Sequence, residues 1–92
     1  MIIYAPHRGS LSDSMAEREE FLNEQEMKRH IIAKWHGLLD AEDIAISENS
    51  YSDDRIGWKD ARYVCVKKVG EDDYIKKYGH PQCIGTCATK YK

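Results

Sequence analysis

The chain has 92 residues, 41% of them hydrophobic, and a formal net charge of −2. This length predicts one domain, because single cores usually occupy about 100–150 residues. No apolar run reaches the roughly 20 residues of a membrane-spanning helix, and an odd count of three cysteines favours reduced thiols in a cytoplasmic protein over a secreted disulfide framework.

The first quarter of the chain predicts a strand, a short helix and an edge segment. Residues 2–5 are apolar and β-branched, which is typical of a strand inside a sheet. Ser10 resembles a helix N-cap, and Leu11 and Met15 mark the buried side of the short helix that follows. Residues 18–22 are then expected to form a short extended edge piece.

The strongest helix signal begins at Asn23, a capping residue with Glu26 three positions later. Gly37 predicts the end of this helix, because glycine readily adopts the left-handed conformation found there. Spacings of four, four and three place one apolar stripe on the helix, made of Met27, Ile31, Trp35 and Leu38.

The second half of the chain predicts two strong strands and one weaker one. Residues 43–48 alternate with period two, and residues 49–57 form a polar loop. Residues 62–69 give the best strand, apolar on both faces. Residues 61–69 are expected to pair antiparallel with residues 82–88. Residues 73–78 can form a helical turn between them.

Together these elements predict a single α+β domain spanning residues 1–92. We expect a four- to five-stranded, mostly antiparallel sheet, packed on one face by one long and one short helix. Ile31, Trp35, Val64 and Val66 are the expected core.

Charge is distributed unevenly, and this bears on partners. Residues 40–60 carry seven acidic and two basic groups, whereas residues 61–92 carry seven basic and three acidic groups. The acidic segment can present a negative surface to a basic partner protein. In the basic segment, lysines interleave with tyrosines as in proteins that stack bases, but the acidic segment beside it argues against nucleic acid.

Trp58 is the residue most suited to a partner surface. It follows Asp53, Asp54 and Arg55 in a polar loop, where a large aromatic side chain can anchor a partner while the charges steer its approach. The alternative, which we favour, is that Trp58 covers the sheet as part of the core.

The sequence also contains two candidate ligand sites, one for an anion and one for a metal. The candidate anion site is the loop with His7, Arg8 and Gly9, which precedes a helix start. This loop lacks the glycine pattern of a phosphate-binding loop.

His80, Cys83 and Cys87 are residue types that zinc prefers, with Cys65 a possible neighbour. Residues four apart on a strand lie about 13 Å from each other, so we predict no metal and no cofactor. No motif frames a nucleophile, and an enzyme is not expected.

Three segments resemble small uncharacterised proteins of phages and mobile elements in Gram-positive bacteria. These segments are residues 2–9, 53–65 and 78–85. The resemblance implies a cytoplasmic accessory protein, without assigned activity, that acts on a host or defence component. Such a protein is expected to bind a protein partner, as a monomer or small homo-oligomer.

Overall fold

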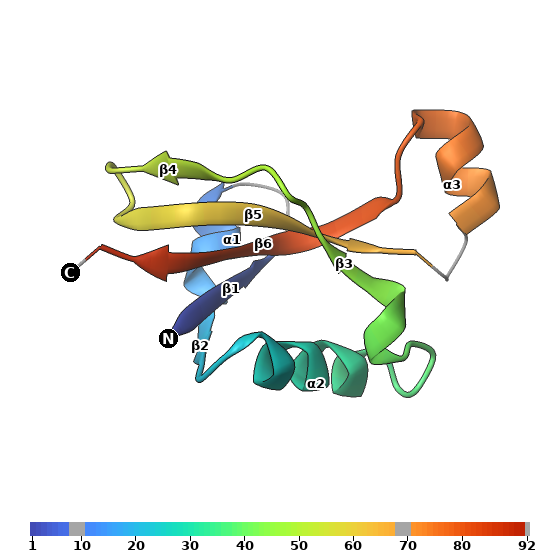
Figure 1. Ribbon diagram of the computed structural model, residues 1–92, viewed down its shortest axis with the longest axis horizontal. Helices are drawn as coiled ribbons and strands as arrows, with labels where there is room; N and C mark the ends of the chain where they lie inside the picture. Colours follow the sequence, from blue (N-terminus) through green and yellow to red (C-terminus); the bar gives the residue numbers. More distant parts are fainter. Residues whose placement is uncertain (8–10, 68–70, 92) are drawn as a thin grey trace.

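Six strands form one sheet, and every strand pairing in the described part of the chain is antiparallel (Figure 1). The computed structural model describes residues 1–7, 11–67 and 71–91. The strands are β1 (Ile2–Pro6), β2 (Glu19–Phe21), β3 (Ile44–Ile46), β4 (Tyr51–Asp53), β5 (Trp58–Val66) and β6 (Gln82–Lys90). The helices are α1 (Leu11–Ala16), α2 (Glu24–Lys34), the short 3₁₀ helix η1 (Ala41–Asp43) and α3 (Glu71–Tyr78). The α+β class is confirmed, with more strands than expected.

The sheet has the order β2-β1-β6-β5-β3, and β4 also pairs with β5. The first strand, β1, therefore lies inside the sheet, between β2 and β6, as predicted. The predicted antiparallel pair of long strands is also confirmed, because β5 pairs with β6 from Trp58 opposite Lys90 to Val66 opposite Gln82.

The prediction of a polar loop over residues 49–57 is wrong, because this segment contains β4. Tyr51 pairs with Ala61 and Asp53 pairs with Trp58, so β4 and the start of β5 form a hairpin. Gly57, with a φ of 72°, lies at the end of its turn. A short edge strand has one neighbour and little burial, so its sequence can be polar without losing its pairing.

Helix α2 begins as predicted and ends earlier. The Asn23 side chain accepts a hydrogen bond from the Glu26 amide at 3.0 Å, which caps the first turn. After Lys34, both His36 and Gly37 have positive φ, so the chain reverses. Leu38 is consequently exposed and Leu39 is buried, which makes the predicted stripe wrong at its last position.

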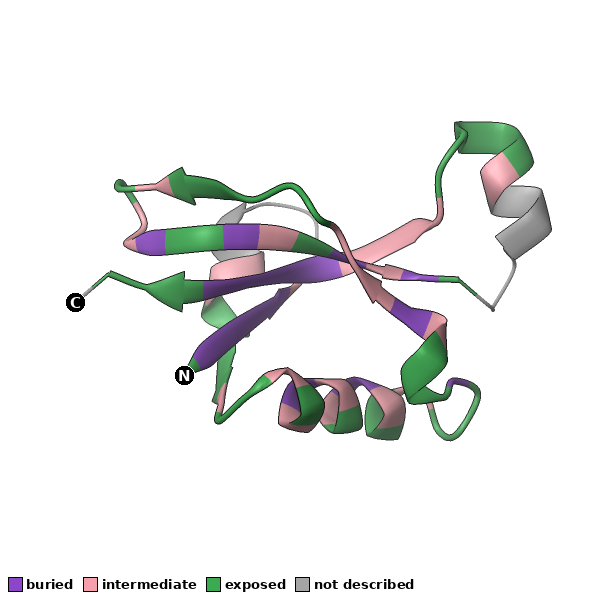
Figure 2. Cartoon of the chain, viewed as in Figure 1, coloured by how far each residue is buried: buried purple, intermediate pink, exposed green. Residues whose placement is uncertain are grey.

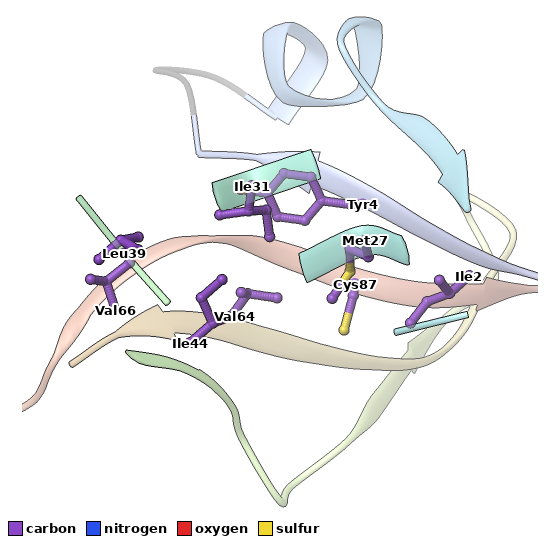
Figure 3. Close-up of a cluster of buried hydrophobic side chains, with 9 residues drawn as sticks. All are labelled: Ile2, Tyr4, Met27, Ile31, Leu39, Ile44, Val64, Val66 and Cys87. Carbon is purple, nitrogen blue, oxygen red and sulfur yellow. The ribbon is translucent and has the colours of Figure 1, made fainter. Parts of the chain in front are cut away.

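One face of the sheet, called the α2 face, carries the larger core (Figure 3). Met27 and Ile31 of α2 are buried against strand residues, and Trp35 packs on the same cluster while remaining half-buried. The buried members are Ile2, Tyr4, Met27, Ile31, Leu39, Ile44, Val64, Val66 and Cys87.

The opposite face, called the α1 face, has a second and smaller cluster. Its buried members are Ile3, Ala5, Trp58, Ala61 and Ala88, with Met15 of α1 packed on them. The two helices thus cover different faces, and the expectation that both cover one face is wrong. The reason lies in β1, whose residues 2–5 are all buried and so need cover on both sides.

Gly85 of β6 allows a close approach between strands on the α2 face. A Cβ atom at this position would lie 2.5 Å from the Tyr4 ring carbon Cε2 and 2.6 Å from the Ala5 carbonyl oxygen. The Tyr4 hydroxyl donates to the Ile84 carbonyl at 3.0 Å, which holds the ring across β6. Only glycine therefore fits beneath this ring.

Candidate functional site

Three aromatic side chains form a row across the α1 face. The His7 and Tyr63 rings lie edge to face with centroids 6.4 Å apart, and the Tyr63 and Tyr51 rings are tilted at 5.8 Å. Tyr51 and Tyr63 are 42% and 46% exposed, and His7 is exposed as well. This row, called the aromatic surface, leaves much of its ring area open to solvent, and Figure 2 shows β4 as largely exposed.

The aromatic surface borders a hollow of about 260 Å³. The strand pairing explains its position, because Tyr63 lies opposite Thr86 and Thr86 lies opposite Ala5, so the three residues share one face. Its lining consists of Ala5, His7, Ser14, Tyr51, Asp53, Ile56, Trp58, Tyr63 and Thr86. The hollow thus has an apolar floor, aromatic walls and one carboxylate.

That carboxylate belongs to Asp53, whose side chain is 19% exposed. The Arg55 guanidinium donates to both of its oxygens, at 3.1 Å from Nε to Oδ1 and at 3.0 Å to Oδ2, and the Arg55 amide also donates to Oδ1. These hydrogen bonds hold the pKa of Asp53 below its usual value. The Arg55 side chain is itself 88% exposed, so this ion pair lies at the surface of the hollow.

The Tyr51 hydroxyl is perturbed by the same surroundings. Burial raises the pKa of Tyr51, the nearby Tyr63 raises it further, and a hydrogen bond with Thr86 opposes the shift. The neutral phenol is therefore the stable form at neutral pH, and the wall of the hollow carries no anionic ring oxygen.

The structure separates the residues predicted for a partner surface. Trp58 is only 3% exposed and packs in the α1-face cluster, so the alternative in which it covers the sheet agrees with its burial. Asp53 and Arg55 join at the hollow, and Asp54 is exposed in the neighbouring turn. His7 belongs to the aromatic surface, whereas Arg8 lies outside the described residues.

The thiol residues do not gather into a metal site. Cys87 is buried in the α2-face core, and Cys83 lies opposite Cys65 on β5 with 3.1 Å between the two sulfur atoms. The His80 ring nitrogen Nδ1 contacts the Pro81 carbonyl oxygen at 2.8 Å. Within the ranges 1–7, 11–67 and 71–91, no three His, Cys, Asp or Glu side chains are placed to hold one ion.

A second hollow, of about 370 Å³, lies between α2 and the strands β1 and β6. His30 Nε2 lies 3.3 Å from a Glu19 carboxylate oxygen within its lining, and Lys34 and Glu17 add one charge of each sign. Two carboxylates, one ammonium group and two histidines, His7 and His30, therefore line this hollow, and the lining has no surplus of cationic groups that would favour an anion.

Sequence reasoning did not assign Tyr51 and Tyr63 to a common site. The period-two pattern of the predicted strand places Tyr63 and Cys65 on one face, and this pattern is the sequence signal that indicates where the Tyr63 ring points. Tyr51 stands among polar residues with no periodic pattern, and only the β4–β5 register brings the two rings together.

In comparisons with known proteins, no family model, no curated protein and no solved structure matches the chain.

Among the described residues, no helix has the length and apolarity that a bilayer span requires.

Proposed function

We propose that this protein is a binding module rather than an enzyme, and that its aromatic surface recognises a basic segment of a partner protein. The observation that carries the proposal is the hollow beside Tyr51 and Tyr63, with the Asp53 carboxylate in its wall. An accessory protein of a phage or mobile element would use such a surface to bind a host or defence protein.

The chemistry of the hollow suits a lysine or arginine side chain. The face of an aromatic ring attracts a cation, which contributes about 0.5–1 kcal/mol at exposed sites and about 2 kcal/mol or more when the cation is desolvated. The Asp53 carboxylate adds a direct ion-pair partner beside the rings. The apolar floor can accept the aliphatic part of a long basic side chain.

The charge around the hollow favours the same partner. The acidic segment of residues 40–60 includes β4 and the turn that follows it, next to the aromatic surface. A negative region of this kind speeds the approach of a basic protein and disfavours the phosphates of a nucleic acid.

Arg55 now occupies the place that the guest cation would take at Asp53. Its guanidinium is exposed, so water and salt screen its attraction to the carboxylate. A guest guanidinium or ammonium group can therefore replace it at small cost. Arg55 acts as a built-in competitor for the carboxylate.

The test uses blocked hexapeptides of matched length, rich in lysine, arginine or glutamate, and a single-stranded RNA of the same length. Their binding is followed by amide chemical shifts in β4 and β5. We expect the two basic peptides to bind and to shift the amides of Tyr51 and Tyr63 most. Tighter binding by the acidic peptide or the RNA, or shifts confined to other strands, would contradict the proposal.

Tyr63→Ala and Tyr78→Ala form a matched pair of variants. Both remove an exposed tyrosine ring, but Tyr78 is 52% exposed at the end of α3, away from the hollow. Tyr63→Ala is expected to weaken binding of the basic peptides by about 0.5–2 kcal/mol. If Tyr78→Ala weakens binding equally, the peptides do not bind specifically at the ring of Tyr63.

Two variants of the ion pair should change the affinity in opposite directions. Arg55→Ala frees the Asp53 carboxylate and should strengthen binding of the basic peptides, whereas Asp53→Asn should weaken it. If Arg55→Ala weakens binding of the basic peptides instead, Arg55 does not compete with them for the Asp53 carboxylate, and this result would contradict the proposed role of the ion pair.

A further inference from the structure

Cys65 and Cys83 lie directly opposite each other on neighbouring antiparallel strands. Opposed residues in such a pair have Cα atoms about 4.5–5.5 Å apart, within the range of about 4.4–6.8 Å that a disulfide spans. Their sulfur atoms are 3.1 Å apart, so both side chains already point toward each other. A modest rotation of the two side chains would bring the sulfurs to bonding distance.

The protein environment sets this pair apart from the third cysteine. Cys65 and Cys83 are half-buried and reachable from solvent, whereas Cys87 is fully buried in the α2-face core. Cys87 lies opposite Tyr4 and Arg62, with neither of the other two cysteines as its strand partner. An oxidant in solution can therefore reach the paired thiols of Cys65 and Cys83, whereas the Cys87 thiol stays reduced.

Burial, with a further contribution from the hydrogen bond to Cys83, raises the pKa of the Cys65 thiol to about 12. In the reduced protein this thiol is protonated and can donate to the Cys83 sulfur, which keeps the two side chains together.

We propose that Cys65 and Cys83 are a redox modification site, at which a small disulfide such as glutathione disulfide oxidises the pair to an intramolecular disulfide. The Cys83 thiolate attacks one sulfur of glutathione disulfide, forms a mixed disulfide and releases one glutathione thiolate, which takes up a proton. The Cys65 sulfur then attacks the Cys83 sulfur, loses its proton and expels the second glutathione. The protein loses two electrons and two protons, and one glutathione disulfide becomes two glutathione molecules.

The disulfide would have two structural effects. It would join β5 to β6 beyond their hydrogen bonds, at the end from which α3 extends (Figure 1). It would also lie on the α1 face, because Val64 and Val66, on either side of Cys65, both belong to the α2-face core and β5 pairs with β3 without a register shift here. The site is independent of the proposed binding function, since it depends on the sulfur geometry alone.

The experiment incubates the full chain in buffers of increasing glutathione disulfide to glutathione ratio, quenches with a maleimide in denaturant, and counts labelled thiols by mass. We expect three labelled thiols in the reduced protein and one in the oxidised monomer, without attached glutathione. Three thiols at every ratio, a stable glutathione adduct, or a disulfide between two chains would overturn the proposal.

Assigning the bond requires a variant, because trypsin leaves Cys83 and Cys87 in one fragment, residues 78–90. In Cys87→Ala, oxidation should remove both remaining thiols. In Cys65→Ser, oxidation should give only a glutathione adduct or no reaction. A disulfide that still forms in Cys65→Ser would have to join Cys83 to Cys87, and this result would refute the pairing.

Discussion

On the α2 face, buried side chains from α2 and four strands enclose a continuous core, whereas on the α1 face a smaller cluster ends at the exposed rings of Tyr51 and Tyr63. Three of these strands, β1, β5 and β6, supply buried residues to both faces, because alternate residues point to opposite sides. The difference arises from the helices: α2 has eleven residues and α1 has six. The shorter helix leaves part of its face uncovered, and that part carries the proposed binding surface.

Trp58→Ala gives the strictest test of whether the α1 face has a core of its own. We expect a loss of about 3–5 kcal/mol in the free energy of unfolding, because a large buried ring leaves a cavity. Urea denaturation measures the loss. In a Trp35→Phe background, Trp58 emission should also be blue-shifted and resistant to quenchers. A loss below about 1 kcal/mol in the free energy of unfolding, together with red-shifted emission, would show that Trp58 is exposed and available to contact a partner.

Ile31→Ala makes the corresponding change on the α2 face. Ile31 is buried between α2 and the sheet, so its truncation should cost about 2–5 kcal/mol. Leu38→Ala is the matched control, because Leu38 is exposed just beyond the same helix and should cost less than about 0.5 kcal/mol. Similar losses for both variants would mean that the helix end has been placed incorrectly.

Gly85→Ala tests the closest approach on the α2 face. The added methyl group would meet the Tyr4 ring and the Ala5 carbonyl oxygen, and overpacking of this kind costs about 1–3 kcal/mol. In a Tyr4→Leu background part of the cost should disappear, since the aromatic ring is gone. A thermal melt of the four proteins gives the coupling, and an unchanged cost in the double variant would assign the clash to the backbone alone.

Tyr63→Ala should have the smallest effect on folding. The ring is almost half exposed and lies on the uncovered part of the α1 face, so we expect a loss below about 1 kcal/mol. Urea denaturation of this variant, run beside Tyr78→Ala, provides the measurement. A larger loss would show that the aromatic surface is part of the core, and its exposed rings would then be poor candidates for recognition.

Local patterns predicted the elements that have strong local causes. The cap at Asn23 and the apolar strand around Val64 depend on neighbouring residues, and both are present. Strand β4 could not be predicted in this way, because its stability comes from pairing with β5 rather than from its own polar residues. Helix α2 ends early because two successive residues, His36 and Gly37, have positive φ values. A histidine does not by itself predict a positive φ, so the sequence does not indicate this end.

The candidate site was predictable only in fragments. Asp53 and Arg55 are close in sequence, and their pairing follows from that proximity. Tyr51 and Tyr63 are separated by a turn, so their contact depends on the register of the hairpin. The sulfur pair depends in addition on the irregularity between Val64 and Cys65, which places Cys83 rather than Ile84 opposite Cys65.

The position of β1 between β2 and β6 affects how the chain folds during its synthesis on the ribosome. Of the six described strands, β1 is synthesised first and β6, one of its two neighbours, is synthesised last, with Ile3 opposite Ala88. At about 5–20 residues per second, β1 waits several seconds for that neighbour. During this time its apolar residues have only β2 and the nearby helices as partners. The apolar residues of β1 are therefore most prone to misassociation until β6 has been made.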